Sequence, residues 1–191
     1  MIKPHGSDQL NPLFVYDDAQ HRALTHEAAS LPSMKLSSAA AANAVMMGSG
    51  YFNPLTGYMN LADALSTAEH MKTTSGLFWP VPVVNLTSDI SAIKGHKRIA
   101  LRDPNVEGNP ILAVMDVQAI EEASEEQMRL MTEKVYRTTD PEHPGVAAFN
   151  SAGRYVVSGP IKVLSFSYFQ TEFPDTFRTA VEIRNEISER G

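Results

Sequence analysis

The sequence predicts an α+β fold, in which a mainly helical first part precedes a strand-rich second part. Residues 1–76 contain segments with helical periodicity, separated by proline and glycine. From residue 77 to about residue 172 the pattern becomes extended and rich in aromatic and β-branched residues. Because the chain has no internal repeat, we expect one domain over residues 1–172 and a helical connector over residues 173–191.

Three helices are predicted in the first part, because each is preceded by a side chain that can accept a hydrogen bond from unpaired backbone N–H groups. The first ends before Leu31-Pro32, since the residue before a proline avoids the α region. Glycines end the second, alanine-rich helix. The three helices begin after Asp17 or Asp18, after Ser37 or Ser38, and at Asn60, and they end near Ser30, Met47 and Met71.

The second part should open with a strand over residues 77–86. Its two prolines cannot donate ladder hydrogen bonds, so we expect an edge strand or an irregular start. Two further strands, 98–101 and 111–117, flank a run of turn residues at 103–110. This arrangement predicts a hairpin.

A capping-box pattern at residues 124–127 predicts the next helix, which should end near Tyr136. Residues 138–145 are polar and contain proline, which is typical of a loop. The remaining expected elements are a strand over residues 155–166 with a bend or bulge at Gly159-Pro160, and a final helix that starts at residues 174–176 and is capped by Gly191.

The composition is that of a packed globular domain, with 43% hydrophobic and 20% charged residues. Sixteen basic against 22 acidic side chains give a net charge of −6, which opposes non-specific binding to nucleic acid or to anionic membranes. The absence of cysteine excludes disulfides, thiolate metal sites and thiol catalysis. No signal-like or membrane-spanning apolar run is present, so we expect a cytoplasmic location.

Residues 50–59, the aromatic turn, are the most informative stretch of the chain. Three aromatic residues stand there around two glycines and a proline. We expect a compact turn whose rings enter a core, because several exposed rings on one short loop would be unfavourable. The stretch contains no nucleophile, which indicates a structural role.

The aromatic turn is one of six segments, in order along the chain, that together resemble a known family; the others are 98–104, 108–110, 139–146, 155–161 and 177–184. These segments are similar to the N-terminal part of ATP sulfurylase, or sulfate adenylyltransferase. The resemblance implies a PUA-like β-barrel with flanking helices. It also implies structural roles for the family-motif residues Gly50, Tyr51, Phe52, Asn53, Pro54, Leu55, Gly57, Arg102, Asp103, Gly159 and Pro160.

Enzymes of this family join ATP, bound with Mg²⁺, to sulfate and release pyrophosphate. The family's catalytic signature, Gln-x-Arg-Asn-Pro-x-His-x-x-His, is expected beyond Gly191; the partial match at residues 183–186 has Glu186 in place of proline. The resemblance therefore implies a non-catalytic domain with no catalytic, cofactor or metal residue of its own. Its expected partners are the catalytic domain and further copies of the enzyme, with neither nucleic acid nor membrane. The candidate contact residues are His143, Phe177, Arg178 and Arg184.

Other motifs favour structural interpretations. His26-Glu27 begins like a zinc-protease pattern, but Ser30 replaces the second histidine. Gly48-Ser-Gly50 resembles a dinucleotide loop, although a helix ends there rather than begins. The glutamates at 121, 122, 125 and 126 are typical of a solvated helix start.

Two polar segments leave alternatives open. His143 lies between two prolines on a stiff backbone, so it either contacts the catalytic domain or a neighbouring subunit, or bonds to nearby backbone. The basic run 94–98 suits a hydrated loop, a phosphate contact or a contact with the acidic face of a partner. The PUA-like resemblance leaves open a second hypothesis, a stand-alone RNA-binding module that uses this run and exposed aromatic residues, which the acidic net charge disfavours. An independent enzyme is a third, minor hypothesis.

Overall fold

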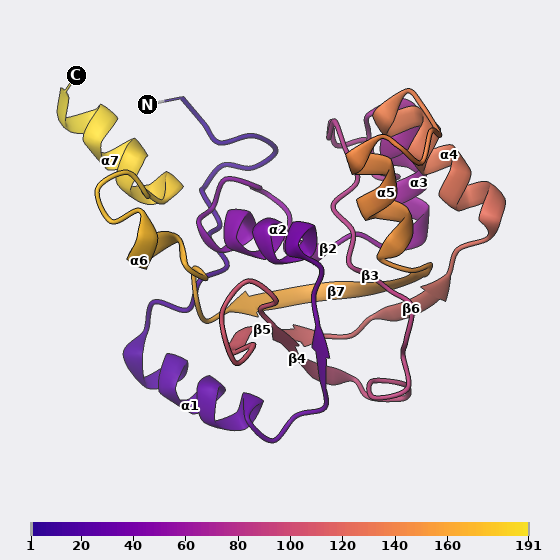
Figure 1. Cartoon of the computed structure of the whole chain (residues 1–191). Coiled ribbons are helices and arrows are strands. Elements are labelled where there is room, and N and C mark those ends of the chain that lie inside the picture. Colours follow the sequence, from indigo (N-terminus) through magenta and orange to yellow (C-terminus); the bar gives the residue numbers. More distant parts are fainter. Residues whose placement is uncertain (1, 191) are drawn as a thin grey trace.

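The computed structural model describes residues 2–190 and confirms the α+β class (Figure 1). In this range, seven strands form one curled sheet and seven helices surround it. The strands are β1 (Ser33–Lys35), β2 (Gly57–Tyr58), β3 (Leu86–Thr87), β4 (Arg98–Arg102), β5 (Ile111–Asp116), β6 (Ala119–Glu122) and β7 (Tyr155–Val163). The helices are α1 (Asp18–Ala28), α2 (Ser38–Gly48), α3 (Leu61–His70), α4 (Glu125–Tyr136), α5 (Pro144–Ser151), α6 (Phe169–Glu172) and α7 (Ala180–Arg190).

Strand β7 is the centre of the sheet because it pairs with four other strands. Its first half is antiparallel to β3 and β6, and its second half is antiparallel to β2 and β5. The partners change near Gly159, where a φ of 145° gives the backbone a shape that suits glycine. The β4–β5 hairpin predicted from its turn residues is confirmed, and β1 adds a parallel strand to β4.

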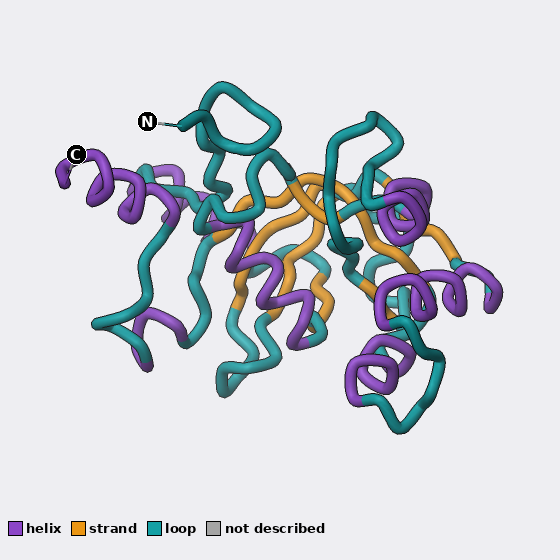
Figure 2. The backbone as a smooth tube through the Cα atoms, turned by 90° about the horizontal axis from the view of Figure 1, so that it is seen from above, coloured by secondary structure: helices purple, strands orange, loops and turns teal. Residues whose placement is uncertain are grey.

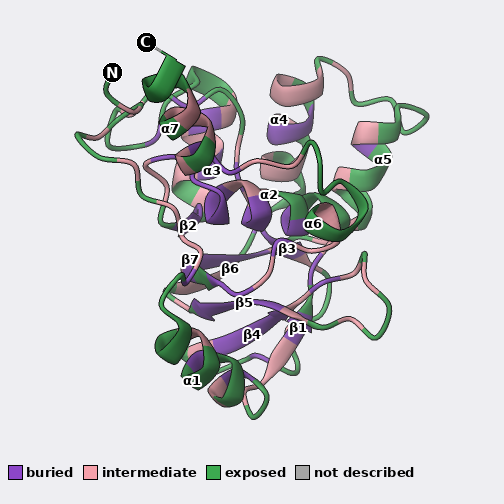
Figure 3. Cartoon of the chain, turned by 90° about the vertical axis from the view of Figure 1, so that its left-hand side faces the viewer, coloured by how far each residue is buried: buried purple, intermediate pink, exposed green. Residues whose placement is uncertain are grey.

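The two faces of the sheet are covered by different helices (Figure 3). Helix α1 packs on one face through Leu24 and Ala28, which lie against Ala100 and Val114. Helix α2 packs on the other face, where Ala40, Ala41 and Ala44 belong to the main core. A Cβ added at Gly48 would lie 2.9 Å from Val163 Cγ1, so the small side chains of α2 allow the helix to approach β7 closely.

Helices α3, α4 and α5 gather at one end of the molecule, and α6 and α7 lie at the other (Figures 1 and 2). Four of the five predicted helix starts are confirmed, since Asp17, Ser37, Asn60 and Ser124 each accept a hydrogen bond from a first-turn N–H group. At Ser124 both bonds of the capping box are present. Local hydrogen bonding therefore fixes where these helices begin.

The strand expected over residues 77–86 is wrong, apart from Leu86 at its end. Only Leu86–Thr87 forms a strand, and Phe78 makes an isolated bridge with Lys72. The segment is instead held through its carbonyl groups: Val83 O accepts from Met59 N and Asn85 O accepts from Val157 N. Pro80 and Pro82 lack the N–H groups that a continuous ladder requires.

The final helix begins later than expected. Residues 174–176 form a turn, and α7 starts at Ala180 after a cap at Thr179. The expected cap Gly191 lies outside the described residues. Residues 138–145 are a loop only as far as His143, because Pro144 occupies the first turn of α5. The prediction also missed α5, which has eight residues, and β1, β2, β6 and α6, which have at most four residues each.

Candidate interface at the C-terminal helix

One end of the molecule carries most of its exposed large apolar side chains. Eight such side chains are exposed within residues 2–190, and five of them lie where the N-terminal segment, the aromatic turn and the C-terminal segment meet. These five are Ile2, Tyr16, Tyr51, Phe173 and Ile187. Exposed apolar groups that gather in one place are typical of a binding surface.

The aromatic turn places only part of its aromatic surface in the core. Tyr58 is buried and donates a hydrogen bond to Ala40 O, and burial raises its pKa above the ordinary value. Phe52 packs edge-on against Trp79. Tyr51 contradicts the expectation, since it stays 43% exposed and donates its hydroxyl to Arg178 O at 2.7 Å. Its ring therefore belongs to the surface that faces the C-terminal segment.

Asn53 ties the N-terminal segment to this turn. Asn53 is buried, with only 5% of the residue exposed, and its side chain makes three hydrogen bonds. Nδ2 donates to His5 O and to Ser7 Oγ, and Oδ1 accepts from Asn11 N. The Asn53-Pro54 peptide bond is cis. The amide thus holds residues 5–11 across the turn.

Replacing Asn53 with alanine should destabilise the fold by about 2–3 kcal/mol, because this buried residue loses the three hydrogen bonds that its side chain makes with His5, Ser7 and Asn11. Amide hydrogen exchange of residues 5–11 should accelerate at the same time. The exposed Asn185 is the matched control, and Asn185→Ala should change stability by less than about 0.5 kcal/mol. Equal stability losses in the two variants, measured by urea unfolding, would contradict the anchoring role of Asn53.

A chain of aromatic rings joins the C-terminal segment to the body. Phe14 stacks on the buried Phe166 with ring centroids 4.3 Å apart. Phe166 contacts Phe177 at 5.4 Å, and Phe177 contacts Phe169 at 6.0 Å. Phe169 in turn lies against Phe173. Because Phe173 is 46% exposed, this chain of rings runs from the core to the surface.

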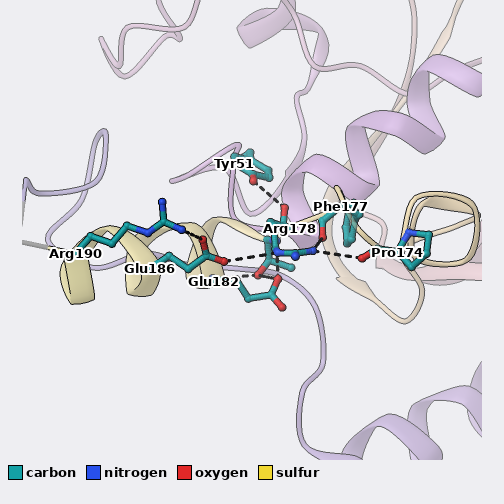
Figure 4. A network of polar contacts seen from close by, with 8 residues as sticks. Tyr51, Pro174, Phe177, Arg178, Glu182, Glu186 and Arg190 are labelled. Carbon is teal, nitrogen blue, oxygen red and sulfur yellow. Dashed lines mark hydrogen bonds and ion pairs between the residues drawn. The ribbon is translucent and has the colours of Figure 1, made fainter.

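Polar contacts fix the start of α7 beside these rings (Figure 4). The Arg178 guanidinium donates to the carbonyls of Phe177 and Pro174, at 2.8 and 3.3 Å, and its Nε lies 3.6 Å from Glu186. Glu186 also pairs with Arg190. Burial raises the pKa of Tyr51, and the negative charge of Glu182 raises it further.

Thr179 and Glu182 form a reciprocal cap on α7. Thr179 N and Oγ1 both donate to Glu182 Oε2, at 2.7 and 2.8 Å, and Glu182 N donates back to Thr179 Oγ1. The hydrogen bond from the Thr179 backbone, followed by that from its hydroxyl, lowers the pKa of Glu182 below its ordinary value. The charged form of Glu182 therefore stabilises the helix start.

Acid should loosen the start of α7. A carboxyl group whose folded pKa lies below its unfolded pKa contributes stability that is complete above the unfolded pKa, about 4.3 for glutamate. That contribution is lost as the pH falls through the folded pKa. We expect an NMR titration of Glu182 to have its midpoint below that of glutamate in an unfolded peptide. Glu182→Gln should remove the acid dependence of hydrogen exchange at the start of α7, and a midpoint at or above the ordinary value would contradict the cap.

A hollow of about 470 Å³ lies between α2 and the aromatic rings. Its helix wall contains Ala42, Val45 and Met46, and its other wall contains Phe169, Phe173, Thr176, Phe177 and Ile183. Ser49, Tyr51 and Arg178 complete the lining. The hydroxyl groups of Ser49 and Tyr51 already donate to Val45 O and Arg178 O. Most of the lining is therefore apolar, and several of its polar groups are engaged within the chain.

The structure brings together some of the predicted contact residues. Phe177 and Arg178 line the hollow, and Arg184 on the neighbouring α7 donates to Ile2 O. His143 lies at the opposite end, where it caps α5 by accepting from Val146 N and packs against Tyr136. Helix α5, which His143 caps, lies at the opposite end of the molecule from α7 (Figure 1), so His143 belongs to a different surface.

Two of the family-motif residues, Arg102 and Asp103, make hydrogen bonds within the chain. Asp103 is buried, and its Oδ1 accepts from Asn105 N in the β4–β5 turn. Arg102 donates to Ser33 Oγ and Asn109 O. In the basic run, residues 94, 96 and 97 are exposed, whereas Arg98 pairs with Glu27 and Asp116. The family-motif residues at 102 and 103 thus lie on the hairpin, away from the C-terminal segment.

Sequence reasoning missed Tyr16, Phe169, Phe173 and the Thr179–Glu182 cap. The pattern Thr-x-x-Glu at 179–182 was a readable capping signal, and phenylalanine recurs every four residues at 169, 173 and 177. Nothing in the sequence marks Tyr16 as a neighbour of Thr179. The proximity of the two side chains depends on the tertiary fold.

A larger cavity of about 700 Å³ lies between α4, α5 and the start of β7. Its two arginines, Arg129 and Arg154, pair with Glu133 and Glu122. Within residues 2–190, the structure contains no group of three metal-ligating side chains. None of the helices described is long and apolar enough to cross a membrane.

Comparisons with known proteins relate the chain to one domain family and one enzyme. A family model described as PUA-like domain matches residues 2–166. Sulfate adenylyltransferase from Allochromatium vinosum is 67% identical over 191 residues, and that from Alcanivorax borkumensis is 62% identical over 191 residues. Each comparison covers 100% of this chain and 48% of the relative. The chain thus spans about half the length of the curated relatives it matches.

A solved structure gives an independent comparison of the fold. The hexameric APS kinase from Thiobacillus denitrificans is similar with a TM-score of 0.71. The comparison covers 100% of this chain and 32% of that chain, with 24% sequence identity. At this identity the likeness concerns the fold alone.

Proposed function

The chain belongs to the PUA-like domain family, as the resemblance implied, and on that premise we propose that it is the N-terminal, non-catalytic domain of a sulfate adenylyltransferase. The observation that carries the proposal is the 67% identity to one such enzyme over all 191 residues. Fold alone would not support a function, because PUA-like domains are modules that unrelated proteins can share. Identity at this level over the whole chain supports the enzyme itself.

In this proposal the complete enzyme joins ATP and sulfate, forming adenylyl sulfate and releasing pyrophosphate. Such a transfer requires cationic groups and backbone donors arranged around the polyphosphate. At the C-terminal end of this chain, Arg178 and Arg184 donate to backbone carbonyls instead. We therefore assign the binding sites for ATP with Mg²⁺ and for sulfate to the half of the enzyme that this chain does not cover. We propose a cytoplasmic location for the whole enzyme.

The role left for this domain is to support and position the catalytic half. Phe177, Arg178 and Arg184 are its proposed contacts on that side, because the first two lie just before α7 and Arg184 lies on it. In the same proposal α7 is the connector. His143, at the opposite end, is the proposed contact with another subunit of a homo-oligomer.

The test compares the full-length protein with the chain of residues 1–191. Sulfate-dependent release of pyrophosphate from ATP should be measurable for the full-length protein and should equal the no-enzyme background for the 191-residue chain. Circular dichroism and a cooperative thermal transition would establish that the shorter chain is folded. Turnover by the pure, folded 191-residue chain would overturn the proposal, as would an inactive full-length protein.

A further inference from the structure

We propose that the hollow between α2 and the aromatic rings is the seat of the catalytic half, which inserts a bulky apolar side chain between Val45 and Phe173. This inference rests on the proposed function, because it requires a second half on the same polypeptide. It adds what that function leaves open: which surface of this domain is covered, and by what kind of group.

The chemistry of the hollow favours an apolar protein side chain over a polar small molecule. A ligand site usually offers a few convergent polar groups that orient its ligand. Here the hydroxyl groups of Tyr51 and Ser49 already donate hydrogen bonds to backbone carbonyls, and Arg178 donates to the carbonyls of Phe177 and Pro174. A mostly apolar surface left in water is unfavourable, whereas covering it with an apolar protein side chain removes it from water and is favourable.

The residue types on this surface also match a protein interface. Tyrosine, phenylalanine, methionine and arginine are enriched at the centres of interfaces, and lysine is depleted. The hollow contains Tyr51, Met46, Arg178 and three phenylalanines, and no lysine is among its lining residues. Exposed Phe173 stands at its edge as a side chain that a partner can cover.

The length of the relatives identifies the partner. This chain accounts for 48% of the Allochromatium vinosum enzyme, so the other half is of similar size. Helix α7 has 11 residues and is therefore only about 16 Å long. A half attached beyond α7 stays near the hollow at an effective concentration that is millimolar for short linkers. A separate copy of the chain has no such advantage.

The test measures thiol modification in the full-length protein. This chain contains no cysteine, so a cysteine introduced into it gives one assignable site, located by peptide mass spectrometry. We choose Phe173→Cys at the edge of the hollow and Phe78→Cys as the control. Phe78 is 53% exposed and lies outside the hollow. Each rate is normalised to the same site in the unfolded protein.

We expect modification at Phe173→Cys to be at least about tenfold slower than at Phe78→Cys. Ala42→Cys, on the opposite wall, should be protected equally. This second variant shows that protection at position 173 does not arise from a local distortion caused by replacing Phe173. Equal rates at positions 173 and 78 in an active enzyme would overturn the inference. Protection that disappears on dilution would also overturn it, by assigning the hollow to a second copy. Protection without sulfate-dependent activity would support docking while the proposed function failed.

Discussion

Replacing Gly159 with alanine is expected to destabilise the domain by about 3–5 kcal/mol, enough to unfold a marginally stable protein. Two causes act together at this position. The φ of 145° lies in a region that residues with a Cβ rarely adopt. A Cβ built there would also lie 2.1 Å from Asp116 O, which is backbone and cannot rotate away. The strand would have to break where β7 changes partners.

Gly95 provides the matched control for this variant. It also has a positive φ, 83°, but an added Cβ would meet nothing within 4 Å. Gly95→Ala should therefore show the conformational cost alone, about 1–2 kcal/mol. Urea unfolding of the 191-residue chain, followed by fluorescence of its only tryptophan, the buried Trp79, measures both. If Gly159→Ala lost no more stability than Gly95→Ala, the close approach to Asp116 would be absent in solution.

The sequence predicted those parts of the fold that local chemistry determines. Helix starts at Asp17, Ser37, Asn60 and Ser124 were correct, because a cap is a contact between residues two or three apart. The β4–β5 hairpin was also correct, since turn residues separate its strands. The PUA-like fold came from resemblance, and its match over residues 2–166 agrees with that origin.

Sequence reasoning failed where a long-range contact competes with a local pattern. Residues 77–86 have strand-forming side chains, yet their carbonyls pair with Met59 and Val157 while their prolines interrupt any ladder. The ring of Tyr51 was expected in the core, but its hydroxyl donates a hydrogen bond to Arg178 O, which is 127 residues later in the sequence. Neither partner can be inferred from neighbouring residues.

The candidate interface could be predicted only in part, for the same reason. Phe177, Arg178 and Arg184 were singled out by resemblance, and they lie just before α7 or on it. The hollow beside them also needs the outer face of α2, with Ala42 and Met46. Helix α2 is separated from Phe173 by more than a hundred residues. Periodicity can describe each wall but cannot place one opposite the other.

Replacing Phe166 with alanine should cost about 3–5 kcal/mol and release the C-terminal segment from the body. Phe166 is 4% exposed and stands between Phe14 and Phe177, so alanine would remove ring contacts on both sides and leave a cavity. Phe78→Ala is the control with the same chemical change. Because Phe78 is 53% exposed, its loss should cost less than about 1 kcal/mol. Urea unfolding of the 191-residue chain gives both values.

The same substitution separates two roles for the chain of aromatic rings. If the rings only fill the core, Phe166→Ala lowers global stability and hydrogen exchange rises evenly. If they also hold α6 and α7 in place, exchange in residues 169–190 should rise well beyond that in β5, which is paired with β4 on one side and β7 on the other. We expect the second result, since Ala180 N to Ser49 O is one of the few backbone bonds that join α7 to the body. An even rise would mean that polar contacts at Tyr51 and Ile2 suffice to position the helix.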